Sequence, residues 1–277
     1  MQILLIFHTP EFEDKMTLDD ATITLLAKRL EDAELTATDI TKITDDYPDM
    51  DWDDAYAIQA AIRKFKEQRG NKIVGLKMGL TSYAKMAQMG VDSPVMGFLA
   101  DYFSCADGAA IDMSGLIHPK VEAEVAFVTK HDLRGPGCNI ARVMSATDFV
   151  VPALEIIDSR YKDFKFDLKS VIADNTSSAR FVVGGKQATL QDLSLRTLGV
   201  VLEKNGVVTE TGAGAAVLGH PANSVAALAN MLAERDEMIP AGTFIMTGGI
   251  TAAVAVSAGD AITVHYQDLG SVSVRFV

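Results

Sequence analysis

The stretch that decides the fold is residues 116–128, "LIHPKVEAEVAFV". Its branched and aromatic residues predict a β-strand, yet Glu122 and Glu124 lie within it. Side chains two residues apart point to the same face of a strand, so that face carries two adjacent carboxylates. Burying a carboxylate is costly unless it is paired or bound to a metal. We therefore expect either two solvated glutamates on an edge strand or a buried site that uses both.

Two further charged residues favour the buried site. Glu155 lies inside the apolar run 150–157, "VVPALEII", and Lys77 lies inside 74–80, "VGLKMGL". Three carboxylates that converge can share a divalent cation, and a shell of oxygen ligands suits Mg²⁺ or Mn²⁺. Lys77 is then either a buried counter-ion to one of these acids or a cation of the active site. The sequence has no His-rich or Cys-rich spacing that would indicate zinc.

Composition narrows the classes of function. The chain has 277 residues, of which 48% are hydrophobic and 22% charged, with a net charge of −12 and two cysteines. An acidic chain without a basic cluster argues against a nucleic-acid or anionic-membrane partner. No apolar run reaches the roughly 18 residues that a membrane-spanning helix needs, and the opening "MQILLIF" is a poor signal peptide. These observations predict a cytoplasmic globular protein.

Two helices are expected first along the chain. Thr17 can cap a helix over residues 18–34, with Asp20 completing a weak capping box. Asp51 can cap a second helix over 52–70, in which apolar residues recur at helical spacing and Gly70 ends the run. Residues 1–15 fit neither helix, so we treat them as an extension without an assigned function.

Short β-like runs follow the helices. They are residues 72–79, 121–129, 148–157, 179–185, 243–248, 261–266 and 271–277. Asn205–Gly206, between two apolar runs, predicts a hairpin turn, and one more helix is expected over 223–236. Because strands and helices do not alternate regularly, we predict an α+β fold. Its parts would be an N-terminal helical cap region, 1–71, and a β-rich catalytic domain, 72–277.

Four other features have ordinary structural interpretations. The histidines beside the first stretch, His118 and His131, are interpreted as structural or surface residues. Arg160 is expected to form a structural ion pair with Asp158 or Asp163. The segment 247–252, "TGGITA", lacks the glycine pattern and the lysine of a phosphate loop, so we interpret it as a plain turn.

The chain resembles the hydratase/decarboxylase branch of the fumarylacetoacetate hydrolase superfamily over residues 17–277. The resemblance rests on the Glu-x-Glu pair and the third acid 31 residues later, together with four motifs. These are "KIVGLKMGLTS", "GVDSP", "EIIDSRY…FDLKSVIADNTSSA" and "LGSVSVRF". It implies a mixed β-roll with a small N-terminal helical subdomain.

The resemblance also implies a set of site residues. Mg²⁺, with Mn²⁺ as the other candidate metal, would be held by Glu122, Glu124 and Glu155, and Lys77 would be catalytic. Residues 81–93 would lie near the mouth of the pocket. The candidate substrate-binding residues are Ser177, Lys120, Leu80 and Asp174. Two of these also have ordinary structural interpretations, because Lys120 can be a surface lysine at the end of a strand and Asp174 can cap a turn.

The activity implied is metal-dependent decarboxylation of 2-oxohex-3-enedioate to 2-hydroxypenta-2,4-dienoate and CO₂, in the degradation of aromatic compounds through catechol meta-cleavage. The electrons left by CO₂ would run through the C=C bond to the C2 oxygen, where a cation stabilises the developing charge. Hydration of the C5 dienoate is the first alternative, and a non-catalytic partner subunit is the second. The expected partners are the unsaturated 2-oxo diacid, further copies of the chain in a homo-oligomer, and the pathway hydratase.

Overall fold

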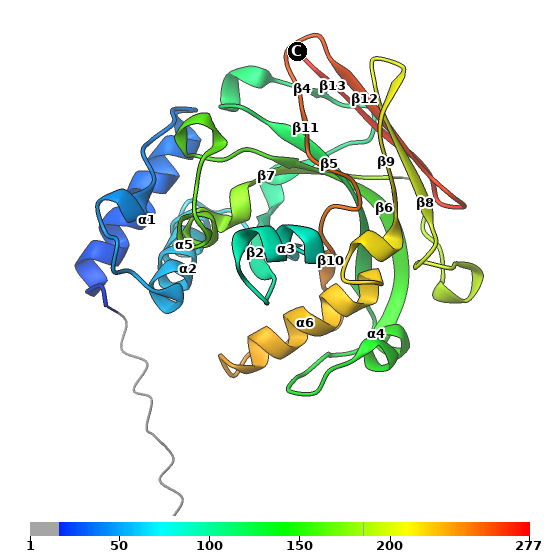
Figure 1. The fold of residues 1–277 in the computed structure, drawn as a ribbon, viewed down its shortest axis with the longest axis horizontal. Helices are drawn as coiled ribbons and strands as arrows, with labels where there is room; N and C mark the ends of the chain where they lie inside the picture. The colour runs from blue at the N-terminus through cyan, green and yellow to red at the C-terminus, as the bar shows by residue number, and fades with distance from the viewer. Residues whose placement is uncertain (1–16, 185) are drawn as a thin grey trace, which may run out of the picture.

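The chain folds into two β-sheets and six α-helices over residues 17–184 and 186–277, which the computed structural model describes (Figure 1). The helices are α1 Asp20–Leu35, α2 Trp52–Gln68, α3 Tyr83–Met89, α4 Ile140–Ala146, α5 Leu168–Ala173 and α6 Pro221–Ala233. The predicted α+β class is confirmed. The predicted extension at residues 1–15 lies outside the described residues.

The larger sheet carries the first stretch at its centre. Its strands run in the order β2-β1-β10-β5-β6-β7-β3, with β11 paired to β5. Their bounds are β1 Ile73–Gly79, β2 Val95–Ala100, β3 Ser104–Cys105, β5 Lys120–Thr129, β6 Thr147–Ile157, β7 Ser178–Val183, β10 Phe244–Met246 and β11 Val254–Ala255. Figure 1 shows β5 and β6 as long, strongly curved strands, with α3 and β2 drawn on the hollow side of the curve.

The smaller sheet has the order β4-β13-β12-β8-β9. Its strands are β4 Ala110–Ile111, β8 Gly199–Lys204, β9 Val207–Ala213, β12 Ala261–Tyr266 and β13 Gly270–Phe276. The predicted hairpin joins β8 to β9, and Asn205 and Gly206 adopt the positive φ angles of 56° and 75° that such a turn requires.

One predicted helix start is correct and the other is wrong. Asp51 caps α2, and Asp54 completes a capping box with it. Helix α1 is capped by Asp19, whose carboxylate accepts a hydrogen bond from the Thr22 N–H at 2.7 Å. Thr17 instead donates its hydroxyl to Asp54 at 2.6 Å, so it ties the segment directly before α1 to α2. Aspartate is at least as good a cap as threonine, and the pattern did not separate them.

The helical cap and the larger sheet share one hydrophobic core. Ile58 and Ile62 of α2 belong to the same buried cluster as Val121 and Val125 of β5. Gln59 of α2 donates to the backbone carbonyls of residues 96 and 172, which anchors the helix to β2 and α5. The division into two domains therefore stays a prediction. Among the described residues, no helix has the length and apolar character needed to cross a membrane.

Candidate metal centre

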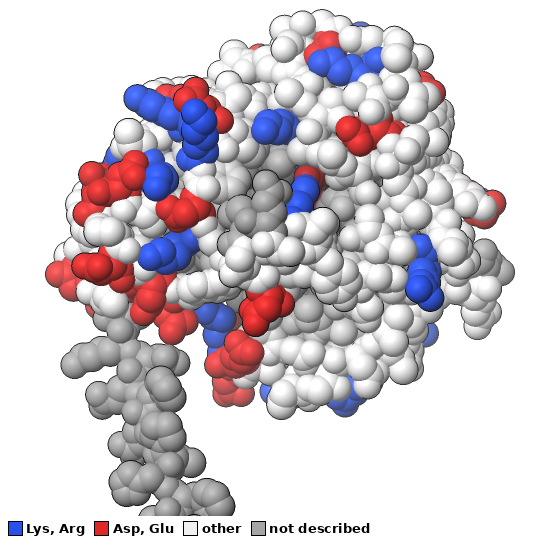
Figure 2. All heavy atoms as spheres, viewed as in Figure 1, with Lys and Arg blue, Asp and Glu red and all other residues white. Residues whose placement is uncertain are grey.

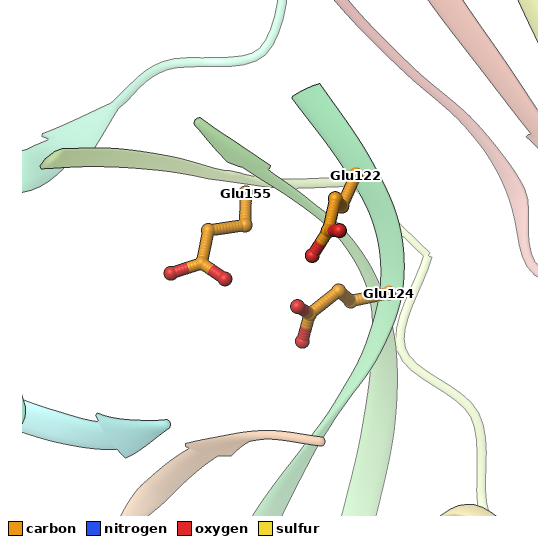
Figure 3. Close-up of side chains that lie close together, drawn as sticks. All are labelled: Glu122, Glu124 and Glu155. Carbon is orange, nitrogen blue, oxygen red and sulfur yellow. The ribbon is translucent and has the colours of Figure 1, made fainter. Parts of the chain in front are cut away.

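The three glutamates meet on one face of the larger sheet because of strand register. Strands β5 and β6 are antiparallel, and Glu122 lies directly opposite Glu155 in the ladder. Glu124 lies two residues along β5 on the same face. One carboxylate oxygen from each residue lies within 4.8 Å of the others, and Figure 3 shows the three side chains pointing toward a common centre.

These carboxylates are buried and incompletely paired. Glu124 and Glu155 have no exposed surface, and Glu122 is partly buried. Oxygens Oε1 of Glu124 and Oε2 of Glu155 accept no hydrogen bond from any described residue. Burial raises the pKa of Glu124 well above its usual value, and the neighbouring Glu155 raises it further, while Lys77 lowers it. Burial also raises the pKa of Glu155, against the lowering effect of Lys77. Without a further cation, the ionised forms of Glu124 and Glu155 are therefore disfavoured.

Lys77 is the buried cation of this cluster. It lies on β1, and its Nζ is 3.0 Å from Oε1 of Glu155 and 3.1 Å from the carbonyl oxygen of Thr176. The side chain also faces the cavity described below. Its position is therefore compatible with each of the two sequence interpretations, a counter-ion to Glu155 and a cation that contacts a ligand.

A left-handed turn follows α5 and faces Lys77. Asn175, Thr176 and Ser177 have φ angles of 46°, 51° and 59°, a conformation that non-glycine residues rarely adopt. Asn175 holds the turn by exchanging two hydrogen bonds with the backbone of Phe98, at 2.9 and 3.0 Å. Gly97 makes room for it, since a Cβ there would lie 2.7 Å from the Thr176 hydroxyl. Such strain is characteristic of functional sites.

The glutamates open into a cavity of about 500 Å³. It contains Lys77, Glu122 and three of the four candidate substrate-binding residues, Leu80, Lys120 and Ser177. Ser177 Oγ is buried without a hydrogen-bond partner among the described residues, which leaves it available to a ligand. One wall is apolar, formed by Ile157, Phe164, Phe166, Leu168 and Val171. Figure 2 shows the surface hollowed near the centre of the viewed face, with basic side chains nearby.

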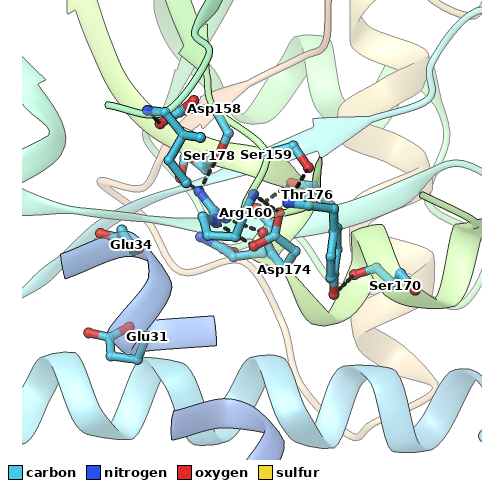
Figure 4. A network of polar contacts seen from close by, with 12 residues as sticks. Glu31, Glu34, Asp158, Ser159, Arg160, Ser170, Asp174, Thr176 and Ser178 are labelled. Carbon is cyan, nitrogen blue, oxygen red and sulfur yellow. Dashed lines mark hydrogen bonds and ion pairs between the residues drawn. The ribbon is translucent and has the colours of Figure 1, made fainter. Parts of the chain in front are cut away.

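The fourth candidate, Asp174, lies in an ion pair away from the cavity lining (Figure 4). Its carboxylate pairs with Arg160, so the expected partners of Arg160 were wrong. The side chain of Asp158 instead accepts the backbone N–H groups of residues 117 and 118, and Asp163 pairs with the exposed Lys165 at 3.5 Å. Burial alone would lower the pKa of Arg160, but Asp174, Glu34 and Asp158 raise it above its ordinary value. The guanidinium therefore stays charged.

Sequence reasoning missed the part that the 247–252 turn plays here. The Gly248 N–H donates to Oε2 of Glu124 at 2.8 Å, which orients that carboxylate. A Cβ on Gly249 would lie 2.9 Å from the carboxylate carbon of Glu122, so only glycine leaves this side of the cluster open. Lys85 of α3, 3.4 Å from Oε1 of Glu122, was also missed. The sequence signal that could have indicated this role was the pair of adjacent glycines, Gly248 and Gly249, beside an apolar strand.

The donor set fits a hard divalent cation. All three groups are carboxylates, two retain unpartnered buried oxygens, and the nearest buried positive group is one lysine. Oxygen-only donors with space for further oxygen ligands suit Mg²⁺ or Mn²⁺ and not zinc. The residues present therefore fit the metal that the sequence predicted.

A curved mixed sheet with a carboxylate cluster opening into a cavity defines a class of enzymes that use a divalent cation. The chain belongs to the fumarylacetoacetate hydrolase family, because the model of the fumarylacetoacetate (FAA) hydrolase C-terminal region matches residues 73–277. This confirms the family and fold predicted from the sequence.

Its relatives include a decarboxylase and a hydratase. It is 67% identical over 261 residues to a 4-oxalocrotonate decarboxylase of Pseudomonas putida, covering 94% of this chain and 99% of that one. A 2-oxo-hept-4-ene-1,7-dioate hydratase of Escherichia coli is 40% identical, with coverages of 94% and 99%. The solved 4-oxalocrotonate decarboxylase from Pseudomonas putida G7, complexed with magnesium and adipate, superposes with a TM-score of 0.94. It is 63% identical and covers 95% of this chain and 100% of its own.

Proposed function

We propose that this chain is a Mg²⁺-dependent carboxy-lyase that decarboxylates 4-oxalocrotonate, which is 2-oxohex-3-enedioate. The products are 2-hydroxypenta-2,4-dienoate and CO₂, as in the meta-cleavage degradation of aromatic compounds. The observation that carries the proposal is the carboxylate cluster in its cavity, in a chain 67% identical to an enzyme of that name. The bond that breaks joins the far carboxylate to its neighbouring carbon, and the electron pair moves through the C=C bond to the C2 oxygen.

Glu122, Glu124 and Glu155 would hold the cation. When bound, Mg²⁺ supplies a positive charge where the C2 oxygen becomes negative. The chain's part is to place three carboxylates on one face of β5 and β6 and to orient one of them through the Gly248 N–H. Mn²⁺ has the same preference for oxygen ligands and can replace Mg²⁺ on this chemistry.

Lys77 would add a second positive charge beside the developing oxyanion. Its ammonium group is fixed by the carbonyl of Thr176, so little reorganisation is needed during the reaction. Ser177 would donate its unpartnered hydroxyl to the substrate, and Leu80 would form part of the wall that excludes water. The location of Asp174 supports a structural role for that residue, because Arg160 already occupies its carboxylate.

Hydration of the C5 dienoate is the second candidate, supported by the 38% identity to a 2-keto-4-pentenoate hydratase of Burkholderia vietnamiensis. A catalytically silent partner subunit is less well supported, because the acids and Lys77 converge on a cavity. We also propose a homo-oligomer and association with the pathway hydratase, in line with the resemblance of the sequence, and a cytoplasmic location, in line with its composition. These three proposals can be checked by sizing the purified chain alone and with that hydratase, and by cell fractionation.

The deciding experiment supplies the C6 diacid and the C5 dienoate separately, each with Mg²⁺. The proposal expects CO₂ release from the diacid and no comparable hydration of the dienoate. Hydration of the dienoate without CO₂ release would establish the second candidate. Absence of both reactions in a folded, Mg²⁺-loaded protein would favour the partner subunit.

A further inference from the structure

Lys120 differs from the other lysines of the cavity because it has no acidic partner. Lys77 pairs with Glu155 and Lys85 pairs with Glu122. Among the described residues, no carboxylate is in ion-pair contact with Lys120, although the chain as a whole carries a net charge of −12. Its ammonium group instead lies 3.9 Å from the centroid of the Phe164 ring. A half-buried cation held by an aromatic face keeps its charge available to an anionic ligand.

The segment that carries Phe164 is built to keep the ring in this position. Asp163 and Phe164 both have positive φ angles, 56° and 58°, which L-residues rarely adopt in succession. The ring packs against His118 at a centroid distance of 5.2 Å and against Phe166 at 5.7 Å. Lys120, Phe164 and Phe166 all line the cavity. Backbone strain that places an aromatic ring beside an unpaired cation indicates a functional contact.

The spacing along β5 fits a six-carbon diacid. Lys120 and Glu122 are two residues apart on the same face of the strand, about 7 Å in extended backbone. An extended chain of six carbons has nearly the length of two backbone residues, which is also about 7 Å. A 2-oxo acid whose first carboxylate lies at the glutamate cluster would therefore bring its far carboxylate toward Lys120. Two apolar residues of the cavity lining neighbour Lys120, namely Ile157, opposite it in the β5–β6 ladder, and Phe164.

We infer that Lys120, held by Phe164, forms the subsite for the far carboxylate and selects 2-oxo diacids over 2-oxo monoacids. This rests on the proposed function for the position of the first carboxylate. A single lysine in an apolar wall binds the anion while offering it few hydrogen bonds. Once the carboxylate has left as neutral CO₂, the product has no group for Lys120 to hold. The subsite therefore favours the substrate over the product as well as the diacid over the monoacid.

The test measures binding without turnover. The probes are 2-oxohexanedioate and 2-oxohexanoate, which lack the C=C bond that accepts the electron pair. Each is titrated calorimetrically into the Mg²⁺-loaded protein. The wild type should bind the diacid about 10- to 100-fold more tightly than the monoacid, the scale of one hydrogen bond to a charged group. Lys120→Met should remove that preference by weakening the diacid alone.

Matched variants separate a subsite from a general charge effect. Lys165→Met removes the same charge from an exposed lysine of the neighbouring segment, one that already pairs with Asp163, and should keep the full preference. Lys120→Arg should retain most of it, and Phe164→Leu should lose part of it because the ammonium is no longer fixed. Lys120→Gln provides a second neutral variant if the methionine variant does not fold.

Two results would overturn the inference. One is a wild-type protein that binds both acids equally, and the other is a neutral Lys120 variant that keeps the diacid preference or loses affinity for both acids alike. Its failure is distinguishable from failure of the proposed function. If only the Lys120 inference is wrong, wild-type protein still releases CO₂ from 2-oxohex-3-enedioate. If the proposed function is wrong, that reaction is absent whatever the two probes show.

Discussion

Two clusters of buried charge meet at the segment 174–177, and they neutralise charge in different ways. In the first, Arg160 pairs with Asp174 and donates to the carbonyls of Asp158 and Ser178 at 2.7 and 3.1 Å (Figure 4). In the second, three glutamates share one buried lysine and keep unpartnered oxygens (Figure 3). The first cluster is complete within the chain, whereas the second is complete only with an added cation. A buried ion pair whose partners all lie within the chain indicates a structural role. A buried group of like charges with unpartnered atoms indicates a ligand site.

The largest effect should come from removing the cation or one of its ligands. EDTA should abolish decarboxylation and Mg²⁺ or Mn²⁺ should restore it, because the developing charge at the C2 oxygen loses its main partner. Glu124→Gln should fold but bind Mg²⁺ too weakly for activity, as measured by calorimetry and CO₂ release. Full turnover in the metal-free protein, or in this variant, would contradict the role given to the glutamates.

Arg160→Met should break the first cluster, in which the buried charges are paired within the chain. It strands the Asp174 carboxylate in the core, which typically costs about 3–5 kcal/mol of unfolding free energy. Denaturant unfolding of this variant and of the wild type measures that difference. Magnesium affinity per folded molecule should change far less than stability. If the variant unfolds like the wild type, the ion pair is not the support that we describe.

Lys77→Ala decides between the two interpretations of that lysine. As an oxyanion partner its loss should lower turnover by about 10²–10³, with folding and Mg²⁺ binding largely intact. As a structural counter-ion to Glu155 its loss should instead cost about 3–5 kcal/mol of stability. Melting curves and kcat, measured on the same preparation with saturating Mg²⁺, separate the outcomes. A folded variant with near wild-type turnover would take Lys77 out of the catalytic set.

The smallest expected effect is a shift of the melting temperature in EDTA. It compares two variants, one from each cluster, in which a buried carboxylate is replaced by its neutral amide. At a pH above the raised pKa of Glu124, Glu124→Gln should raise the melting temperature, because there it removes one of three repelling charges and keeps an acceptor for the Gly248 N–H. The gain is on the order of 1–3 kcal/mol, the cost of an unsatisfied buried group. Asp174→Asn should lower the melting temperature, because it leaves Arg160 unpaired. Millimolar Mg²⁺ should stabilise the wild type by mass action but not Glu124→Gln. Shifts of the same sign in both variants would remove the distinction between the clusters.

Strand periodicity was enough to place part of the site. It put Glu122 and Glu124 on one face of a strand, because the alternation of side chains is a local property. The contact of Glu155 with this pair required the register of β5 with β6, which no local pattern specifies. The sequence therefore offered Glu155 only as a charge inside an apolar run, and the resemblance to a family made it the third ligand. Asp174 was misplaced for the same reason, since its contact with Arg160 forms only when β6 and α5 come together.

The helices and strands that the sequence did not predict are mostly short. Helices α3, α4 and α5 have six or seven residues each, too few for a helical period to emerge from the sequence. Strand β2 is buried at every position, so it lacks the alternation that marks a half-exposed strand. Helix α2 was placed correctly because it is long, periodic and capped by Asp51.

The uneven burial of the three glutamates has a kinetic consequence. Glu124 is fully buried and the side chain of Glu155 is 1% exposed, whereas that of Glu122 is 13% exposed. Among the described residues, Glu122 is the member of the cluster that lines the cavity, so we expect a metal ion to enter and leave past Glu122. We expect a diacid bound in the cavity to close this route, so that the ion associates first and the acid second. Loss of the ion to a chelator should accordingly be slow while the cavity is filled and fast once it empties.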